Sequence, residues 1–227
     1  TPTLSELSAN PSGKGGFNDL LSVQKAKNFD FGLKFKSEST SFSIIGFIVN
    51  TENDLVPYEL EEFPGRSFYQ NAGKTLRKGI EIDFNHRLNK NFSTSIIYNF
   101  TNFKYEEYML GESNLNGNYL PGIPTRFGNF ELKYKNSKEL SAIYSRNYRG
   151  NLYANDNNTE EINSFWRDDI SLSIPVKIGK NIFDLFLGCN NIFDKLYTDN
   201  VRINAFGNRY YEAAPGRIFF TGIKILI

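Results

Sequence analysis

Apolar and polar side chains alternate with a period of two through most of this chain. In residues 28–36, large apolar side chains occupy Phe29, Phe31, Leu33 and Phe35, and the positions between them are polar or glycine. A period of two predicts a β-strand with one apolar face and one polar face. The pattern therefore favours an all-β protein.

The same alternation predicts nine strands, separated by turn-forming residues. They lie at 28–36, 40–56, a stretch ending near Leu88, 92–107, 128–135, 139–152, and around 170–174, 183–189 and 217–227. Short turns are expected at 37–39, 89–91, 136–138 and 179–180, and long connections at 57–66, 109–124, 155–164 and 199–215. Pro57 is expected to end the second strand, because proline cannot continue an interior strand. Residues 1–27 are expected to form a loop.

Short and long connections fall at opposite ends of these hairpins. Outer-membrane β-barrels have this arrangement, with short periplasmic turns and long extracellular loops. We therefore predict an antiparallel transmembrane β-barrel in the bacterial outer membrane, with residues 1–27 extracellular and lipid around its apolar face. The strands at 28–36, 79–88, 128–135 and 217–227 are near the ~9–11 residues needed to cross a bilayer. The predicted lipid-facing residues in them are Phe31, Ile82, Leu132 and Ile225.

Apolar and polar side chains also alternate in the strands of a soluble sandwich or a lipocalin-like barrel. Three features favour the membrane barrel: the apolar faces are rich in the chain's 21 Phe and 13 Tyr, several strands exceed the usual ~5–6 residues, and no second set of apolar faces forms an inner core. Nine strands do not make a complete single-chain barrel, whose strand number is even, and open sheet edges are not tolerated in lipid. We expect strands from elsewhere to complete the sheet.

The composition excludes several classes of function. A net charge of +1 gives no support for nucleic-acid binding. The single Cys189 rules out an internal disulfide framework and is expected to pack on an apolar face. The first residues lack a signal peptide, so we expect that the start was removed or that the chain is the C-terminal part of a longer protein.

No catalytic group, cofactor site or metal site is predicted, and we expect no enzyme activity. His86 is the only histidine, and it is expected to be a solvated strand-end residue. With one His and one Cys, a His/Cys metal cluster is excluded. Asp156, Glu160 and Glu161 offer oxygen ligands for calcium, although an ordinary solvated loop is the favoured interpretation.

Several segments resemble TonB-dependent outer-membrane transporters, in the order found near the C-terminus of that family. They are residues 2–7 (Pro-Thr-Leu-Ser-Glu-Leu), 10–11 (Asn-Pro), 25–34, 71–73 with 78–81, 119–124 (Tyr-Leu-Pro-Gly-Ile-Pro), 190–197 (Asn-Asn-Ile-Phe-Asp-Lys-Leu-Tyr), 209–211 and 215–217. Two positions depart from the family pattern: Asp30 stands where Glu is more common, and the terminal Ile227 stands where an aromatic residue is usual.

The resemblance implies that residues 1–227 are the C-terminal portion of a 22-stranded receptor barrel. Large plugged barrels of this size are a known class. The N-terminal barrel strands, the plug domain and the TonB box that engages the TonB complex would then lie outside this sequence.

The predicted long loops carry arginine and aromatic side chains suited to an anionic chelate, because arginine binds oxyanions bidentately and stacks on planar groups. The candidate substrate-binding residues are Arg149, Arg202, Arg209, Tyr210 and Tyr211. Trp166 is assigned to an interfacial aromatic girdle. Arg167 and Asp169 are expected to form an ion pair inside the barrel.

The function expected first is TonB-driven uptake of a scarce nutrient, such as a ferric siderophore or a similar small-molecule metal chelate. A passive porin-like channel and a non-transporting outer-membrane receptor or assembly component remain alternatives. A plug domain before residue 1 would distinguish the first from the second.

Overall fold

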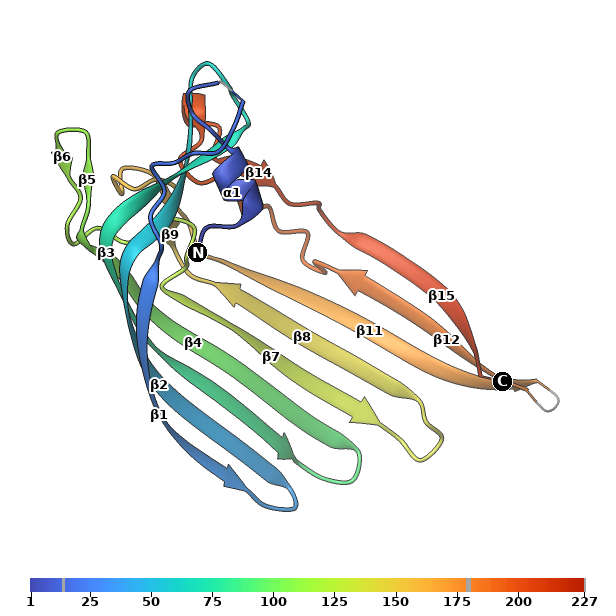
Figure 1. Ribbon diagram of the computed structural model, residues 1–227. Coiled ribbons are helices and arrows are strands. Elements are labelled where there is room, and N and C mark those ends of the chain that lie inside the picture. Colours follow the sequence, from blue (N-terminus) through green and yellow to red (C-terminus); the bar gives the residue numbers. More distant parts are fainter. Residues whose placement is uncertain (14, 179–180, 227) are drawn as a thin grey trace.

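Nine strands form one antiparallel sheet in the computed structural model, which describes residues 1–13, 15–178 and 181–226. Each strand pairs with the next of the nine along the chain, and Figure 1 shows them as a curved, open wall. The strands are β1 (Lys25–Lys36), β2 (Thr40–Glu59), β3 (Ser67–Arg87), β4 (Phe92–Glu107), β7 (Arg126–Lys135), β8 (Ser141–Arg149), β11 (Phe165–Ile178), β12 (Asn181–Asn190) and β15 (Ile218–Leu226). The predicted all-β meander is confirmed.

The register places the alternating residues on two distinct faces. Phe31 pairs with Gly46, Gly46 with Ile80, and Ile80 with Phe100, so one row of the apolar face crosses four strands. Many of these side chains have no cover, and Phe31 is 76% exposed. Such a large uncovered apolar surface needs an apolar environment. The faces agree with the predicted ones for Phe31, Ile82 and Leu132, while the side chain of Ile225 lies outside the described residues, as do Gly179, Lys180 and Ile227.

Pro57 does not end the second strand, and that prediction is wrong. β2 continues to Glu59, with Pro57 opposite Tyr69 of β3. The last residue of β2 that pairs with β1 is Glu52. Beyond it, one edge of β2 has no ladder partner, so the missing N–H of proline costs no sheet hydrogen bond.

The segment predicted as a loop over 1–27 is partly regular. A short helix, α1 (Leu4–Ser8), begins with a capping box in which Thr3 Oγ1 accepts from Glu6 N at 3.3 Å and Glu6 Oε2 accepts from Thr3 N at 2.6 Å. β1 also begins at Lys25, three residues before the predicted start. The Thr-x-x-Glu spacing was readable in the sequence as a helix start.

The long connections contain structure that the alternation did not predict. The predicted strand over 139–152 is shorter, because β8 ends at Arg149. Three small hairpins and one turn of 3₁₀ helix follow the main strands: β5 (Met109–Leu110) with β6 (Ser113–Asn114), β9 (Leu152–Tyr153) with β10 (Glu161–Ile162), β13 (Thr198–Val201) with β14 (Tyr211–Ala213), and η1 (Phe206–Asn208). Short turns and long connections lie at opposite ends of the sheet, as predicted, and we name these the short-turn end and the long-loop end (Figure 1).

The buried apolar core gathers at the long-loop end. One cluster comprises Val56, Ala72, Tyr105, Tyr108, Leu115 and Leu120, and a second comprises Leu152, Ala154, Ile162, Ala205 and Tyr210. The first joins the ends of β2, β3 and β4 to the connection after β4, and the second joins the connections after β8 and β12 to each other. In the described part of the chain, no helix has the length and apolar character needed to cross a bilayer.

The two faces of β3 predict opposite responses to a new charge. Ile82 lies on the apolar face and Asp83 on the polar face. Replacing Ile82 with Arg should lower the free energy of unfolding in lipid vesicles by about 2–4 kcal/mol, because the guanidinium enters hydrocarbon. Asp83→Arg should cost much less. Denaturant titration of both variants measures the difference, and equal losses would contradict the assignment of the faces.

Candidate functional site

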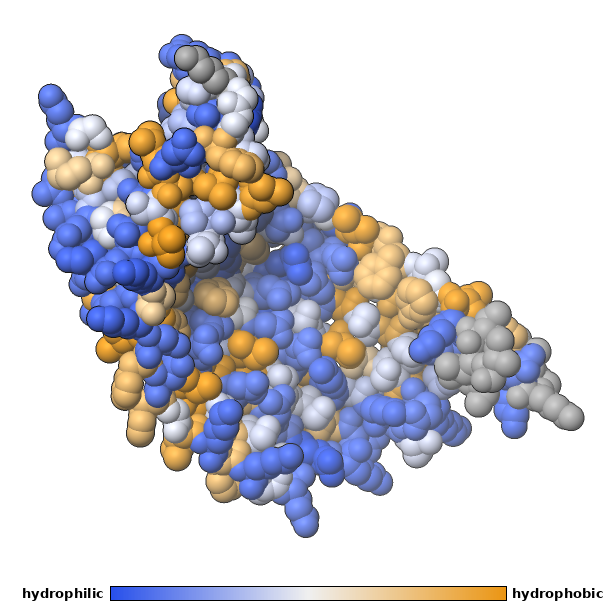
Figure 2. All heavy atoms as spheres, in the orientation of Figure 1, coloured by the Kyte–Doolittle hydropathy of each residue, from blue (hydrophilic) through white to orange (hydrophobic). Residues whose placement is uncertain are grey.

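The polar face of the sheet is hollow and hydrophilic, and the long-loop end overhangs it (Figure 2). A network of polar side chains covers β8 and β11 on this face. Arg167 Nη2 lies 3.0 Å from Asp169 Oδ2, so the predicted ion pair is present. Asn147 Nδ2 donates to the same Asp169 oxygen at 3.2 Å, and Asn129 Nδ2 donates to Asn147 Oδ1 at 2.9 Å. The ion pair is therefore part of a hydrogen-bonded network that crosses β7, β8 and β11.

A buried carboxylate, Asp156, ties three long connections together. Its Oδ1 accepts from Tyr105 Oη at 2.7 Å, and its Oδ2 accepts from Asn204 Nδ2 at 3.0 Å. Its backbone N–H donates to Asn204 Oδ1 at 2.9 Å, and its carbonyl accepts from Asn118 Nδ2 at 2.8 Å. No cation pairs with this carboxylate in the described part of the chain.

Burial raises the pKa of the Asp156 carboxyl above its ordinary value, and the hydrogen bonds from Tyr105, Asn204 and Tyr108 offset part of that effect. Desolvation disfavours the charged form of a carboxyl group, which explains the direction. The stability of the packed long connections therefore depends on the protonation state of Asp156.

Two of the predicted site residues, Arg202 and Tyr210, have structural partners. Arg202 Nη2 lies 2.7 Å from Glu59 Oε1, which joins the connection after β12 to the end of β2. Tyr210 is 8% exposed and belongs to the second apolar cluster, and its hydroxyl donates to Asn208 Oδ1 at 3.3 Å. Both residues fix the long-loop end.

Arg149 has N–H groups without a hydrogen-bond partner among the described residues. It ends β8 on the polar face, its guanidinium lies 4.7 Å from the ring centroid of Phe165, and its Nη1 donates to the Asp199 carbonyl at 3.3 Å. Its Nε and Nη2 are buried and have no hydrogen-bond partner among the described residues. Phe165 in turn stacks on Tyr197, with ring centroids 4.3 Å apart. We name Arg149, Phe165 and Tyr197 the Arg149 cluster.

The remaining two predicted site residues lie at the surface. Arg209 is exposed beside η1, and Tyr211 is 53% exposed with its hydroxyl donating to Glu160. The five predicted residues thus share one end of the molecule but do not converge as a group. Phe165 and Tyr197 were missed, although Phe165 is an aromatic residue on the polar parity of its strand, a position that lipid contact does not explain.

The three carboxylates considered for calcium do not meet. Asp156 is in the tyrosine network, Glu160 accepts from Tyr211, and Glu161 accepts from Asn151 Nδ2 at 2.7 Å. In the part of the chain that the structure describes, no group of three or more His, Cys, Asp or Glu side chains is arranged to hold a metal.

The segment 190–197, which carries the strongest sequence resemblance, forms a compact turn after β12. Asn191 and Asp194 have φ of 53° and 51°, a conformation that Asn and Asp tolerate better than most residues. Asn191 Oδ1 accepts from Lys195 N at 2.9 Å, and Asp194 Oδ1 accepts from Arg217 N at 2.7 Å. The motif sets the path of the chain and carries Tyr197 into the Arg149 cluster.

Comparisons with known proteins agree with this architecture. A family model described as TonB dependent receptor-like, beta-barrel matches residues 1–192. A probable TonB-dependent siderophore receptor, PiuA of Acinetobacter baumannii, is 23% identical over 208 residues, which is 88% of this chain and 26% of PiuA.

Solved structures share the fold. The copper transporter OprC superposes with a TM-score of 0.74 at 21% identity, over 98% of this chain and 35% of OprC. The ferric citrate transporter FecA superposes with a TM-score of 0.72 at 18% identity, over 89% of this chain and 31% of FecA. The chain thus spans about a quarter to a third of the length of these proteins.

The raised pKa of Asp156 predicts that the long-loop end is more stable at mildly acidic pH. Folding binds the proton more tightly, so this stabilisation is complete below the ordinary carboxyl pKa of ~4 and is lost as the pH rises through the higher folded value. Hydrogen exchange at Leu152 and Ala154 should therefore slow, after correction for intrinsic rates, as the pH is lowered toward that range. Asp156→Asn, which cannot ionise, should abolish this dependence. Persistence of the dependence in the variant would assign it to another group.

Proposed function

Because this chain belongs to the TonB-dependent receptor-like β-barrel family, we propose that it forms one wall of a TonB-driven transporter for a metal chelate, with a ferric siderophore as the first candidate. Members of this family are bacterial outer-membrane proteins, and they transport rather than catalyse. The chain is therefore an outer-membrane β-barrel protein and not an enzyme. The cargo and its route belong to the proposal.

The two open edges of the sheet support the proposal that this chain is part of a larger barrel. β1 pairs only with β2, and β15 pairs only with β12. In lipid an unpaired edge leaves backbone N–H and C=O groups unsatisfied, each at a cost of several kcal/mol. In the proposal, N-terminal strands of the same receptor pair with β1 and β15 to complete a 22-stranded barrel. A plug domain fills its lumen and carries the contact with the TonB complex.

The guanidinium of Arg149 is the observation that carries the cargo proposal, because two of its donors are buried without a protein partner among the described residues and a ligand anion that enters beside Phe165 would satisfy them. Arg149 Nε and Nη2 have no partner among the described residues, and aromatic rings lie beside them. Guanidinium groups bind carboxylate-like oxygens through paired N–H donors, and aromatic rings stack on planar ligands. An anionic chelate with a planar ligand frame matches both. In this proposal Arg149, Arg209 and Tyr211 contact the cargo, and Arg202 and Tyr210 hold the loops that present them.

The fold by itself is compatible with more than one metal. OprC, a copper transporter, and FecA, a ferric citrate transporter, both share it with this chain. PiuA, which is similar in sequence, is a probable siderophore receptor, and that similarity makes a ferric siderophore the first candidate. A passive porin-like channel is the alternative, and it would move cargo without the TonB complex.

Removing the two proposed cargo contacts should weaken binding. In the full receptor, Arg149→Gln with Arg209→Gln should lower the affinity for a transported ferric siderophore at least tenfold, about 1.4 kcal/mol. Isothermal titration against a panel of ferric chelates measures the change. Arg87→Gln is the control, because Arg87 is exposed on the same polar face at the opposite end of β3. Unchanged affinity in the double variant, at normal abundance, would contradict direct contact.

The orientation of the wall can be tested in intact cells. With Cys189 replaced by Ala, single cysteines at Asn116 or Asn157 should react with an impermeant maleimide, because both residues are exposed in long connections. A cysteine at Lys90, in a short turn, should react only after the outer membrane is opened. Labelling of Lys90 in intact cells, without labelling at the other two positions, would reverse the topology.

A further inference from the structure

The two donor atoms of Arg149 that have no partner among the described residues, Nε and Nη2, belong to one edge of its guanidinium. Nε–H and the neighbouring Nη2–H point the same way, and together they match the paired oxygens of a carboxylate. Nη1, on the other side of the group, already donates to the Asp199 carbonyl at 3.3 Å. The edge without a partner is therefore the one that a planar anion with two oxygens needs.

Aromatic side chains flank Arg149 on both neighbouring strands. Phe127 of β7 and Phe165 of β11 each lie directly opposite Arg149 in the ladders, on the polar face of the sheet. No carboxylate of the described residues lies within ion-pair distance of the Arg149 guanidinium. Because apolar rings keep water away from this cation, its attraction for an anion is stronger than at an exposed site.

A groove with a volume of about 440 Å³ lies beside the Arg149 cluster. Phe165 and Tyr197 line it, and they are also the aromatic members of the cluster. Tyr211 adds a third ring, and Asn163 and Ser164 add polar groups. The groove thus connects the cluster with Tyr211, another of the candidate site residues.

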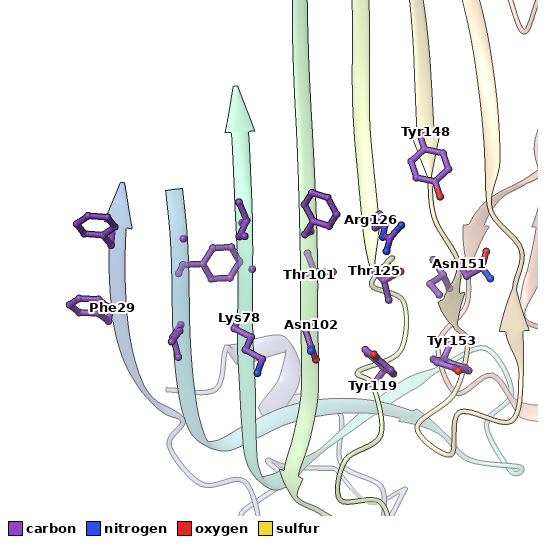
Figure 3. A pocket seen from close by; sticks show the side chains of 18 of the residues that line it. Phe29, Lys78, Thr101, Asn102, Tyr119, Thr125, Arg126, Tyr148, Asn151 and Tyr153 are labelled. Carbon is purple, nitrogen blue, oxygen red and sulfur yellow. The ribbon is translucent and has the colours of Figure 1, made fainter. Parts of the chain in front are cut away.

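A larger groove, with a volume of about 980 Å³, lies on the opposite face of the sheet (Figure 3). Phe29, Lys78 and Tyr148 line it, and all three lie on the apolar face. Lipid covers that face, so a cargo inside the barrel does not reach this groove. The smaller groove, which Phe165 of the polar face lines, belongs to the side that the cargo uses.

The guanidinium edge and the aromatic wall together define a class of ligand. Paired donors select a carboxylate over a neutral amide, because an amide turns an N–H toward one of them. Aromatic walls favour a flat ring that stacks on them. A carboxylate whose two oxygens coordinate a metal ion turns them away from the guanidinium. The group that fits is therefore an aromatic ring with a carboxylate that is free of the metal.

We propose that Arg149 and the groove beside it bind an aromatic carboxylate of the cargo, a group that does not coordinate the metal. The two carboxylate oxygens accept hydrogen bonds from Nε and Nη2, and the ring stacks against the Phe165–Tyr197 pair. The inference rests on the proposed function for its occupant, since the cargo is what reaches the polar face at the long-loop end. It adds the chemical group by which the receptor recognises that cargo.

Small probes test the site without the whole cargo. The full receptor, purified in a nonionic detergent, is titrated with para-fluorobenzoate, and fluorine NMR of the probe measures its affinity. Para-fluorobenzamide, which has the ring without the charge, should bind at least tenfold more weakly. Cyclohexanecarboxylate has the charge without the aromatic ring, and it should compete for the site at least tenfold more weakly than unlabelled benzoate. These comparisons use the unmodified receptor, so they do not depend on the folding of a variant.

Variants then assign the binding to Arg149. Arg149→Lys keeps the charge and removes the paired donors, so the affinity for para-fluorobenzoate should fall at least tenfold, and Arg149→Gln should lower it further. Arg87→Lys is the matched control, because Arg87 is exposed on the same polar face at the short-turn end, and it should leave the affinity unchanged. Equal affinity for the benzoate and the benzamide, no binding of either, or unchanged affinity in Arg149→Lys would overturn the proposal.

Competition separates this inference from the proposed function. A ferric chelate that binds the receptor should displace para-fluorobenzoate, and simultaneous binding of both would overturn the assignment of the site to cargo. If the probe binds as expected but the receptor takes up no metal chelate, the proposed function fails and the carboxylate site stands. If the receptor takes up a chelate but does not bind the probe, this inference alone fails.

Discussion

The backbone ladder of the nine-stranded sheet is the constraint on which the rest of this molecule depends. In a bilayer no water reaches the backbone, so each N–H and C=O must find its partner on a neighbouring strand. The continuous antiparallel pairing from β1 to β15 meets that requirement along the paired lengths of the strands and leaves the two outer edges of the sheet open. Because the ladder fixes which residues stand opposite one another, it also fixes which side chains meet lipid and which face the interior.

A single-layer sheet has no room for a core between layers, and the buried residues therefore collect where the long connections fold over the strand ends. Asp156 is central there, since it joins Tyr105 of β4 to Asn204 of the last long connection. The glutamate at the end of β2, Glu59, has a similar role through Arg202. The long-loop end is consequently a small packed domain built from segments that are distant in sequence.

Each face of the sheet carries both paired and unpaired cations. On the polar face, Arg167 is neutralised by Asp169, and Arg149 keeps unused donors beside aromatic rings. On the apolar face, Arg146 is paired with Asp168, and Lys78 and Arg126 are exposed without a carboxylate partner among the described residues. The paired cations bind carboxylates of the same sheet, and on the polar face Arg149 is the proposed cargo contact.

The sequence by itself determined the strands, their order and their faces, because a period of two is a local property and the short turns leave consecutive strands only one simple way to pair. It also placed the Arg167–Asp169 pair correctly, since the two residues are on one parity of one strand. Only the tertiary structure decided which candidate site residues are held by contacts with other parts of the chain. Arg202 meets Glu59 across 143 positions of sequence, and Asp156 meets Asn204 across 48. Contacts at that separation depend on how the long connections fold over the sheet, and no local pattern of side chains specifies that path.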